Sequence, residues 1–369
     1  MVRILYLGEL SPGQTARMRM RALQRLGHQV LGIDTIQPWR RASWLNRQWQ
    51  RRLSRGAIVR GINRSVRVGA LVLRPDLVWA DKQEFLWAST VEMLRRQGAL
   101  TLHFTPDPYF SLTWKQTPLQ SEALHSYDVL AYCKAYEREP YEAIGSTLLE
   151  LPLGFCEEQH RPLPPSDPSW CSAVGFLGGW EPRRQQLLRA AAAVVTAADG
   201  GVNIWGGHWD FLRTGRAGLR SRLILRQLAG AEPYAIQSDP LIARCLRGDE
   251  VYGDAYAQAL TGARIGLGFL RRVCPDQHTT RSFEIPACGS LLLADRSPEH
   301  QRLFQEGVEA EFFSSAEELV DKVRFYCRHE SARARIAAAG RRRCLSGGYS
   351  YRHRLQRALQ TLGVASPGA

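Results

Sequence analysis

Short apolar runs separated by longer amphipathic segments recur along the first half of the chain. Runs at 2–8, 28–34, 76–82, 99–104, 128–134 and 146–154 are nearly continuous in apolar residues. Continuous rather than alternating runs are typical of strands buried on both faces of a parallel sheet. Helix-like segments lie between them, so the pattern predicts a βαβ series with a six- or seven-stranded parallel sheet over residues 1–156.

A proline-rich segment divides the pattern. Residues 157–170 contain four prolines and are predicted to be a linker. A second α/β series follows over residues 171–345. Its apolar runs near 172–177, 201–205, 265–270 and 290–295 are predicted strands, and a helix is expected near 350–362. The fold class is therefore α/β with two Rossmann-like domains.

Composition agrees with this division. A chain of 369 residues can bury two cores, and 44% hydrophobic content is typical of a globular protein. The sequence has no run of eighteen apolar residues and opens on VRILYLG without a signal pattern, so we expect a cytoplasmic protein without membrane spans. Eight scattered cysteines without a CxxC pair indicate reduced thiols, and no zinc site is expected.

The net charge of +14 allows three classes of partner: nucleic acid, an anionic membrane, or phosphorylated small molecules. No nucleic-acid-binding motif accompanies the charge, so nucleic acid is not expected. In residues 37–67, tryptophans 39, 44 and 49 alternate with arginines. This composition suits a peripheral contact with the inner face of an anionic membrane. The alternative is that the tryptophans pack on the N-terminal domain while the arginines face water.

The strongest candidate for a binding site is the stretch 271–289, RRVCPDQHTTRSFEIPACG. A buried strand, a polar loop and a helix start form an anion site, because free backbone N–H groups point at the ligand. Thr279 or Thr280 is expected to cap the helix, and an arginine fork suits phosphate oxygens. Phosphate donors combined with two acids for hydroxyl groups suit a nucleotide-sugar. The candidates are Arg271, Arg272, Asp276, His278, Thr279, Thr280, Arg281 and Glu284.

The segment from Asp276 to Phe304 resembles the C-terminal signature of bacterial family 1 glycosyltransferases with the GT-B fold, in particular the spore-maturation-protein-like group. The family has two glutamates separated by seven residues, and here Asp276 stands at the first position. The resemblance implies two Rossmann-like domains facing across a cleft, with Glu284 on the ribose hydroxyls and Asp276 near the sugar. It also implies that the last helix, within 346–369, packs back on the N-terminal domain.

Two further loops are assigned with the help of this resemblance. Gly179, Arg183 and Arg184 follow a strand of the second domain, and the family uses arginine there to contact a diphosphate. Solvated helix arginines are the alternative. Gly8, Ser11 and Gly13 follow the first strand, in a loop that borders the cleft in the family. Arg17, Arg19 and Arg21, on the next helix, are interpreted as its solvated face, with a role in ligand binding as the alternative. Trp205 and Trp209 are candidates for nucleobase contacts.

The acceptor side is predicted at the end of the strand 99–104. His103 and Asp107 can act there as a base or position an acceptor hydroxyl. Alternatively, His103 belongs to the core and Asp107 fixes the turn between two prolines. The acid pair spaced by seven residues favours a retaining mechanism, and a true base at His103 or Asp107 would indicate inversion.

These features predict a glycosyltransferase (EC 2.4) that moves a sugar from a nucleotide-sugar to an unidentified acceptor, such as a cell-envelope glycan, a lipid-linked glycan or a secondary metabolite. No DxD pair occurs, so a metal-independent reaction without a cofactor is expected, with arginines neutralising the leaving diphosphate. Two other functions stay open: a sugar-nucleotide-binding protein without activity, and a basic protein that binds anionic lipid or nucleic acid.

Overall fold

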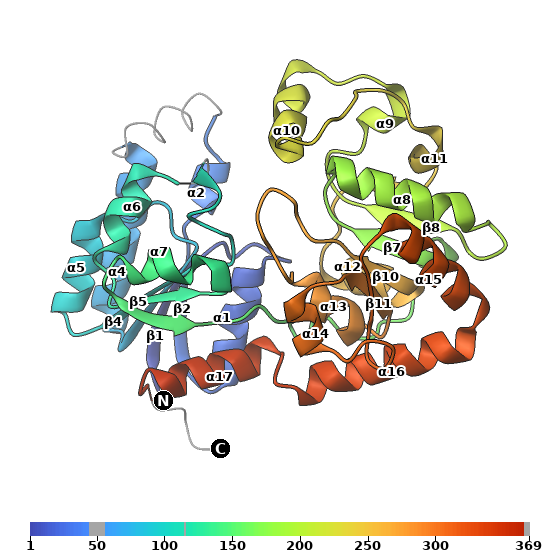
Figure 1. The fold of residues 1–369 in the computed structure, drawn as a ribbon. Coiled ribbons are helices and arrows are strands. Elements are labelled where there is room, and N and C mark those ends of the chain that lie inside the picture. The colour runs from blue at the N-terminus through green and yellow to red at the C-terminus, as the bar shows by residue number, and fades with distance from the viewer. Residues whose placement is uncertain (44–55, 114–115, 365–369) are drawn as a thin grey trace. The chain divides into compact units, whose positions relative to one another are not determined.

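The computed structural model describes residues 1–43, 56–113 and 116–364. The chain forms two compact units, one from Met1–Cys156 together with the chain from Ser350 onward, the other from Glu157–Tyr349. Each unit has a six-stranded parallel sheet with helices packed against it (Figure 1). The predicted α/β class with two Rossmann-like domains is therefore confirmed.

The sheet of the first unit has the order β2-β1-β3-β4-β5-β6. Because β3 lies on the opposite side of β1 from β2, the winding reverses between β1 and β3, and ligands of such sheets bind where it reverses, beyond the carboxyl ends of the strands. The strands are β1 (Arg3–Gly8), β2 (Gln29–Asp34), β3 (Leu77–Asp81), β4 (Leu100–Phe104), β5 (Val129–Tyr132) and β6 (Thr147–Glu150).

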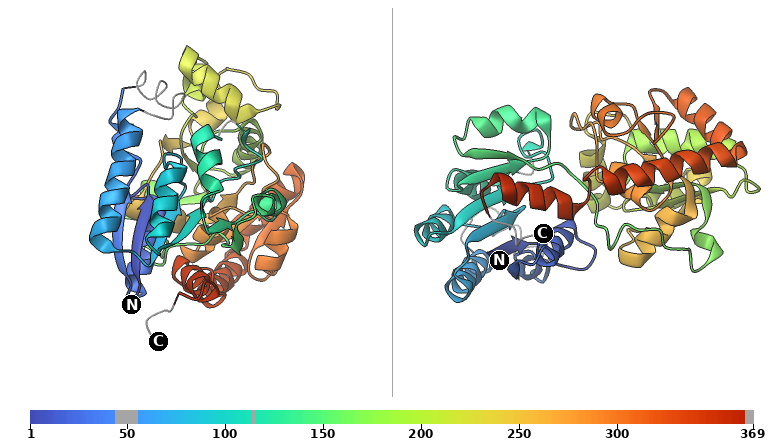
Figure 2. Two further views of the ribbon diagram at one scale, coloured as in Figure 1. Left: turned by 90° about the vertical axis from the view of Figure 1, so that its left-hand side faces the viewer. Right: turned by 90° about the horizontal axis from the view of Figure 1, so that it is seen from below.

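Helices cover both faces of this sheet (Figure 2). Leu5 and Leu7 of β1 pack with α4, α5 and α6 on one face. The intervening Tyr6 points to the other face, where α1 and α17 contact each other. The helices are α1 (Thr15–Arg25), α2 (Gln37–Arg40), α4 (Ala57–Leu73), α5 (Ala88–Arg96), α6 (Pro118–Leu124), η2 (Ala135–Glu137), α7 (Arg138–Glu142) and α17 (Tyr351–Thr361).

One α1 arginine is buried, contrary to the prediction that Arg17, Arg19 and Arg21 share a solvated face. Arg19 is 2% exposed and donates to both carboxylate oxygens of Asp81, at 2.6 and 2.9 Å. The Tyr6 hydroxyl donates to the same carboxylate, and the guanidinium lies 5.4 Å from the centre of the Tyr351 ring. A paired and stacked cation therefore joins α1, β3 and α17.

The predicted membrane-facing segment is only partly described. Trp39 stacks on Phe85 at 4.6 Å, in agreement with packing on the N-terminal unit. Trp44, Trp49 and the arginines between them lie outside the described residues. None of the described helices is long and apolar enough to cross a membrane.

The second unit has the sheet order β12-β11-β10-β7-β8-β9, which reverses between β7 and β10. Its strands are β7 (Ser172–Leu177), β8 (Val202–Trp205), β9 (Leu246–Gly248), β10 (Ala263–Gly268), β11 (Leu291–Asp295) and β12 (Glu311–Phe313). Its helices are η3 (Pro168–Trp170), α8 (Pro182–Val194), α9 (Phe211–Thr214), α10 (Leu219–Ala229), α11 (Pro240–Ala243), α12 (Gly253–Gly262), α13 (Arg281–Ala287), α14 (Pro298–Leu303), α15 (Ala316–Arg328) and α16 (Glu330–Ser346).

The proline-rich segment 157–170 is part of this second unit and lies against α12. Leu163 N donates to Thr261 Oγ1 at 3.0 Å, and Ser166 N donates to Gln258 Oε1 at 3.1 Å. The Trp170 ring then stacks on Trp205 at 5.6 Å. These contacts fix the segment along its length.

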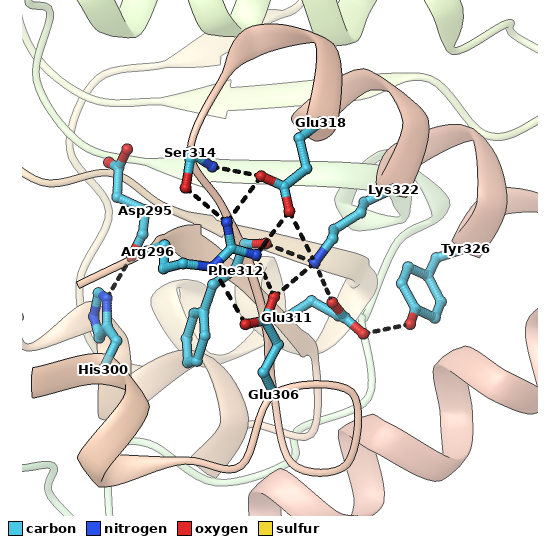
Figure 3. A network of polar contacts seen from close by, with 10 residues as sticks. All are labelled: Asp295, Arg296, His300, Glu306, Glu311, Phe312, Ser314, Glu318, Lys322 and Tyr326. Atoms are coloured by element: carbon cyan, nitrogen blue, oxygen red, sulfur yellow. Dashed lines mark hydrogen bonds and ion pairs between the residues drawn. The ribbon is translucent and has the colours of Figure 1, made fainter. Parts of the chain in front are cut away.

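An ion-pair network joins β11, β12 and α15 of the second unit (Figure 3). Arg296 donates to both Glu306 and Glu318, and Lys322 pairs with Glu306 and Glu311. Hydrogen bonds from Arg296 lower the pKa of Glu318 to about 2. The network stabilises the β12 edge of the sheet, which lies two strands away from the reversal between β7 and β10.

Candidate donor site and acceptor site

The floor of the candidate donor site is the loop that follows β7, held by the loop that follows β8. Gly178 N donates to Trp205 O at 2.9 Å, and Trp180 N donates to Gly207 O at 3.0 Å. Gly206 has φ +150°, and a Cβ there would lie 2.0 Å from Gly178 O. Only glycine allows this approach of the two backbones.

The tryptophans of this region belong to the core. Trp205 is 4% exposed and Trp209 is 2% exposed, and Trp209 Nε1 donates to Gly178 O at 2.9 Å. Their rings are covered, so the prediction that they contact a nucleobase is wrong. Their physical role is to hold the loop after β7.

Three of the predicted arginines converge on this floor. Arg184 and Arg271 both pair with the carboxylate of Glu181, at 3.2 and 3.4 Å. Arg281 Nε donates to Leu177 O, the last carbonyl of β7, at 3.0 Å. Arg184 also donates to Gly179 O at 3.0 Å. The residues come from α8, α13 and the loop after β10, and meet where the sheet reverses.

The charges of this cluster are poorly compensated. Burial lowers the pKa of Arg184, and the neighbouring cations Arg271 and Arg281 act in the same direction, against the attraction of Glu181. Burial also raises the pKa of Glu181 against the attraction of both arginines. Two guanidinium groups thus share one carboxylate that is itself disfavoured as an anion, an arrangement that a phosphate group would relieve.

Arg183, predicted together with Arg184 to contact the diphosphate, binds the side chain of Asp295. It makes a two-pronged ion pair with Asp295 at the end of β11, and its backbone N donates to Glu232 at 3.2 Å. Asp295 also accepts from Leu270 N at 2.7 Å. Arg183 therefore ties α8 to β11 and to the loop after β10.

Glu284 lies buried in α13, beside the arginine cluster. Its carboxylate accepts from the Tyr256 hydroxyl at 2.5 Å and from Arg281, and His160 Nε2 lies 3.6 Å away. Burial alone would raise the pKa of Glu284, but His160, Arg281 and Tyr256 together hold it below its usual value. Glu284 is therefore a charged carboxylate next to the predicted diphosphate position.

The helix that bears Glu284 differs from the prediction in its start. α13 has seven residues, and neither Thr279 nor Thr280 caps it through a side chain. Instead Ser282 Oγ accepts from Thr279 N at 3.1 Å. So short a helix offers little dipole, and positive charge at this site comes mainly from arginine side chains.

The other predicted residues of the stretch are spread around α13. His278 is buried and bonded through Nδ1 to Glu299, and Asp276 is 9% exposed. Arg272 is exposed to solvent. Among the described residues, no group of three or more His, Cys, Asp or Glu side chains is placed to hold a metal ion.

The predicted acceptor residues lie on and just beyond β4, which neighbours β3 and is one strand away from the reversal between β1 and β3. His103, on β4, is 1% exposed, and burial lowers its pKa to about 4 although Gln83 and Asp81 favour its protonated form. His103 therefore lies in the core in this structure, which corresponds to the second of the two alternatives given for it. Asp107, three residues beyond β4, is partly exposed and pairs with Lys82 at 2.5 Å.

Lys82 was not among the predicted site residues, although its position directly after a buried strand was a usable signal.

The loop after β1 contains the predicted residues Gly8, Ser11 and Gly13. A Cβ on Gly8 would lie 3.1 Å from Ala16 Cβ, so Gly8 allows α1 to pack closely. Gly13 has φ +83°, and Ser11 Oγ accepts from Arg40 at 3.1 Å.

Comparisons with known proteins agree with this architecture. A family model described as "Glycosyl transferase-like" matches residues 183–360. No curated protein matches the sequence. Among solved structures, Anabaena Alr3699/HepE in complex with UDP-glucose is 13% identical with a TM-score of 0.63, covering 99% of this chain and 100% of that chain. Sucrose-phosphate synthase from Thermosynechococcus elongatus is 12% identical with a TM-score of 0.61, covering 98% and 99%.

A third solved structure, an alpha-glucosyltransferase in complex with UDP-glucose and DNA containing an abasic site, is 9% identical with a TM-score of 0.65 and covers 98% of both chains. Identities this low establish the fold alone. The chain therefore has the two-domain GT-B fold, and residues 183–360, which carry the arginine cluster and Glu284, resemble a glycosyltransferase family.

Proposed function

We propose that this chain is a glycosyltransferase (EC 2.4) that moves a sugar from a nucleotide-sugar to an acceptor hydroxyl. The observation that carries the proposal is the arginine cluster, in which Arg184 and Arg271 share the single carboxylate of Glu181 beside Arg281. A diphosphate bound there would add negative charge to a cluster in which two guanidinium groups share one carboxylate, at the edge where α/β sheets bind ligands.

The comparisons support the same proposal. The glycosyltransferase-like family model spans residues 183–360, and two of the similar solved structures hold UDP-glucose. A UDP-sugar is therefore the first donor to test. In the proposed complex, the Glu284 carboxylate accepts hydrogen bonds from the ribose hydroxyls, and Asp276 lies near the sugar.

The proposed reaction needs no metal, because guanidinium groups stabilise the charge that develops on the leaving diphosphate. The spacing of Asp276 and Glu284 supports a retaining outcome. A chiral analysis of the product's anomeric configuration tests this point: an inverted product would assign the base role to a residue of the first unit.

A thermal-shift panel of UDP-, GDP-, TDP- and CMP-sugars tests the proposal. A ligand at a hundred times its Kd stabilises the native state by about 2.7 kcal/mol. One nucleotide class should therefore raise the melting temperature, and its diphosphate without sugar should retain part of the shift. If no nucleotide of the panel raises the melting temperature, the proposed function is wrong.

The Glu284→Gln variant tests the assigned carboxylate. It keeps the hydrogen bond from Tyr256 but loses the charge, and a hydrogen bond to a charged group contributes about 1.5–3 kcal/mol, so the donor Kd should rise about tenfold or more. Glu317→Gln, on the exposed start of α15, is the matched control and should leave the Kd unchanged. Equal affinity of the Glu284→Gln protein would contradict the role.

We also propose a peripheral contact with an anionic membrane through residues 37–67. The arginines of the segment support it, whereas Trp39 packs inward on Phe85 and does not contribute. Flotation with phosphatidylglycerol vesicles should recover the protein, and with phosphatidylcholine vesicles should not. Equal recovery from both would contradict an electrostatic contact.

A further inference from the structure

Lys82 has a backbone conformation that lysine rarely adopts. Its φ is +53°, and only Arg74 and His208 share a positive φ among the described residues other than glycine. The left-handed region is unfavourable for a residue with a side chain, because Cβ crowds the following carbonyl. Such strain persists only where the surrounding structure imposes it, and it is concentrated at functional sites.

The surroundings of Lys82 impose this conformation firmly. Its N–H donates to Phe104 O at 2.7 Å, which extends the β3–β4 pairing by one residue. The preceding Asp81 is locked by Arg19, and Gln83 Nε2 donates to Asp81 O at 3.0 Å. These bonds fix the turn after β3, so the Lys82 side chain extends from the carboxyl end of β3 towards the loop after β4.

The ammonium group reaches the loop after the neighbouring strand. Lys82 Nζ lies 2.5 Å from Asp107 Oδ2, and the two side chains are 47% and 27% exposed. Burial disfavours the charge on Lys82, but Asp107, Glu84 and Asp81 outweigh it and raise its pKa, so the amine is protonated. In contrast to the buried pair of Arg19 and Asp81, the side chains of this pair are partly exposed.

The pair lies beyond the carboxyl ends of β3 and β4, and β3 is one of the two strands between which the winding of the first sheet reverses. In α/β proteins, ligands bind near such a reversal. His103, the other candidate there, is covered by the core. Of the two predicted acceptor residues, Asp107 is therefore the partly exposed one. We propose that Lys82 is a positioning residue that holds the Asp107 carboxylate in place to accept a hydrogen bond from the acceptor hydroxyl.

This inference rests on the proposed function, since it names the acceptor-side residues of the same reaction. The chemistry fits an alcohol acceptor such as a sugar hydroxyl, with water as the simplest substitute. In the transfer itself, the acceptor oxygen bonds to the anomeric carbon, the bond from that carbon to the diphosphate breaks with its electron pair, and the hydroxyl proton passes to the departing diphosphate. The carboxylate orients the hydroxyl for this step.

Three variants separate charge from backbone strain. Lys82→Asn removes the ammonium but tolerates the left-handed conformation, Lys82→Gly relieves the strain, and Asp107→Asn removes the carboxylate charge. Arg74→Gly is the matched control, because Arg74 has φ +49° at the end of α4 in the same unit and is exposed. Each protein is assayed for melting temperature, for the donor Kd, and for nucleoside-diphosphate release from the nucleotide-sugar with water and with glucose as acceptors.

We expect both glycine variants to melt about 2–4 °C above the wild type, since strain is removed. All three site variants should release nucleoside diphosphate at least about tenfold more slowly, with a donor Kd within about twofold of the wild-type value, because the donor contacts come from the second unit. Arg74→Gly should keep the wild-type rate. Lys82→Arg, which keeps a cation, should recover part of the rate.

Other outcomes overturn the inference. A Lys82→Gly protein with an unchanged rate means that the pair takes no part in transfer. A protein that is both slower and less stable than the wild type marks Lys82 as a structural residue. Donor binding without measurable release by the wild type leaves no transfer for the pair to assist. If no nucleotide-sugar binds at all, the proposed function itself has failed, which is a distinct result.

Discussion

At the scale of the residue, the buried His103 should contribute to a pH dependence of the stability of the first unit, together with His28, whose pKa is also lowered by burial. His103 has a pKa of about 4 in the folded protein because burial disfavours its charge, whereas the unfolded value is about 6.5. The contribution of neutral His103 to the free energy of unfolding is complete above pH 6.5. It is lost as the pH falls towards 4, because the histidine binds a proton in the unfolded chain before it does so in the folded protein.

His103→Leu should reduce this dependence and leave the part that His28 contributes. Each proton bound only by the unfolded chain changes the free energy of unfolding by about 1.4 kcal/mol per pH unit. Denaturant unfolding at pH 7 and pH 5 should therefore give a smaller difference for His103→Leu than for the wild type. His125→Leu, at an exposed position, is the control. A difference equal to that of the wild type would show that His103 takes no part.

Residue burial was predicted unevenly from the sequence. Arg19 lies three residues after Ala16 and four before Leu23, both buried, so its place on the apolar face of α1 was visible in the spacing. Its partner was not, because Asp81 is 62 residues away. For the same reason the pairing of Arg271 with Glu181 follows from the fold and not from any local pattern.

At the scale of the element, Gly206 should be the least replaceable glycine of the donor-site floor. Gly206 and Gly201 stand on either side of β8 and both have positive φ, but only at Gly206 would a Cβ meet backbone, 2.0 Å from Gly178 O. Gly201→Ala should cost about 1 kcal/mol through strain alone. Gly206→Ala should cost at least about 3 kcal/mol, because the loops after β7 and β8 must separate.

Urea unfolding of the two alanine variants, followed by tryptophan fluorescence, checks this difference. Gly206→Ala should also weaken donor binding, since Arg184 bonds to Gly179 O on the displaced loop. Equal destabilisation by both substitutions would show that the two loops have room to move.

Elements were easier to predict than their ends. Continuous apolar runs predicted the strands of the first sheet and the four central strands of the second, β11, β10, β7 and β8, which placed the candidate loops at the carboxyl edges. The three-residue edge strands β9 and β12 were missed, because runs this short carry no clear pattern. The predicted cap of α13 was wrong because Thr280, at the N-cap, has a helical backbone and its side chain accepts no hydrogen bond from a backbone N–H of the helix. Ser282 Oγ instead accepts from Thr279 N, ahead of the helix. The side chains that face a ligand depend on contacts between such loops, which the sequence does not specify.

At the scale of the whole molecule, the first unit is built from two separate parts of the chain. The segment from Ser350 joins it through a bridge between Phe155 and Ser350, and Tyr351 lies against Arg19. A chain ending at Tyr349 should therefore lose stability in the first unit, while the second unit keeps its own sheet and helices.

Calorimetry of the shortened chain checks this expectation. One transition should move to lower temperature, and the transition that a bound nucleotide raises should stay in place. A uniform shift of both transitions, or no shift, would contradict the division of the chain.

The central claim is that the arginine cluster binds a diphosphate, and calorimetric titration of UDP into two arginine variants tests it most directly. Arg184→Gln removes a cluster cation, whereas Arg189→Gln removes a cation of the same helix that pairs with Asp239 outside the cluster. Loss of one charged hydrogen bond should raise the Kd about tenfold or more for Arg184→Gln and leave it unchanged for Arg189→Gln. Equal affinity of both variants and the wild type would contradict the account.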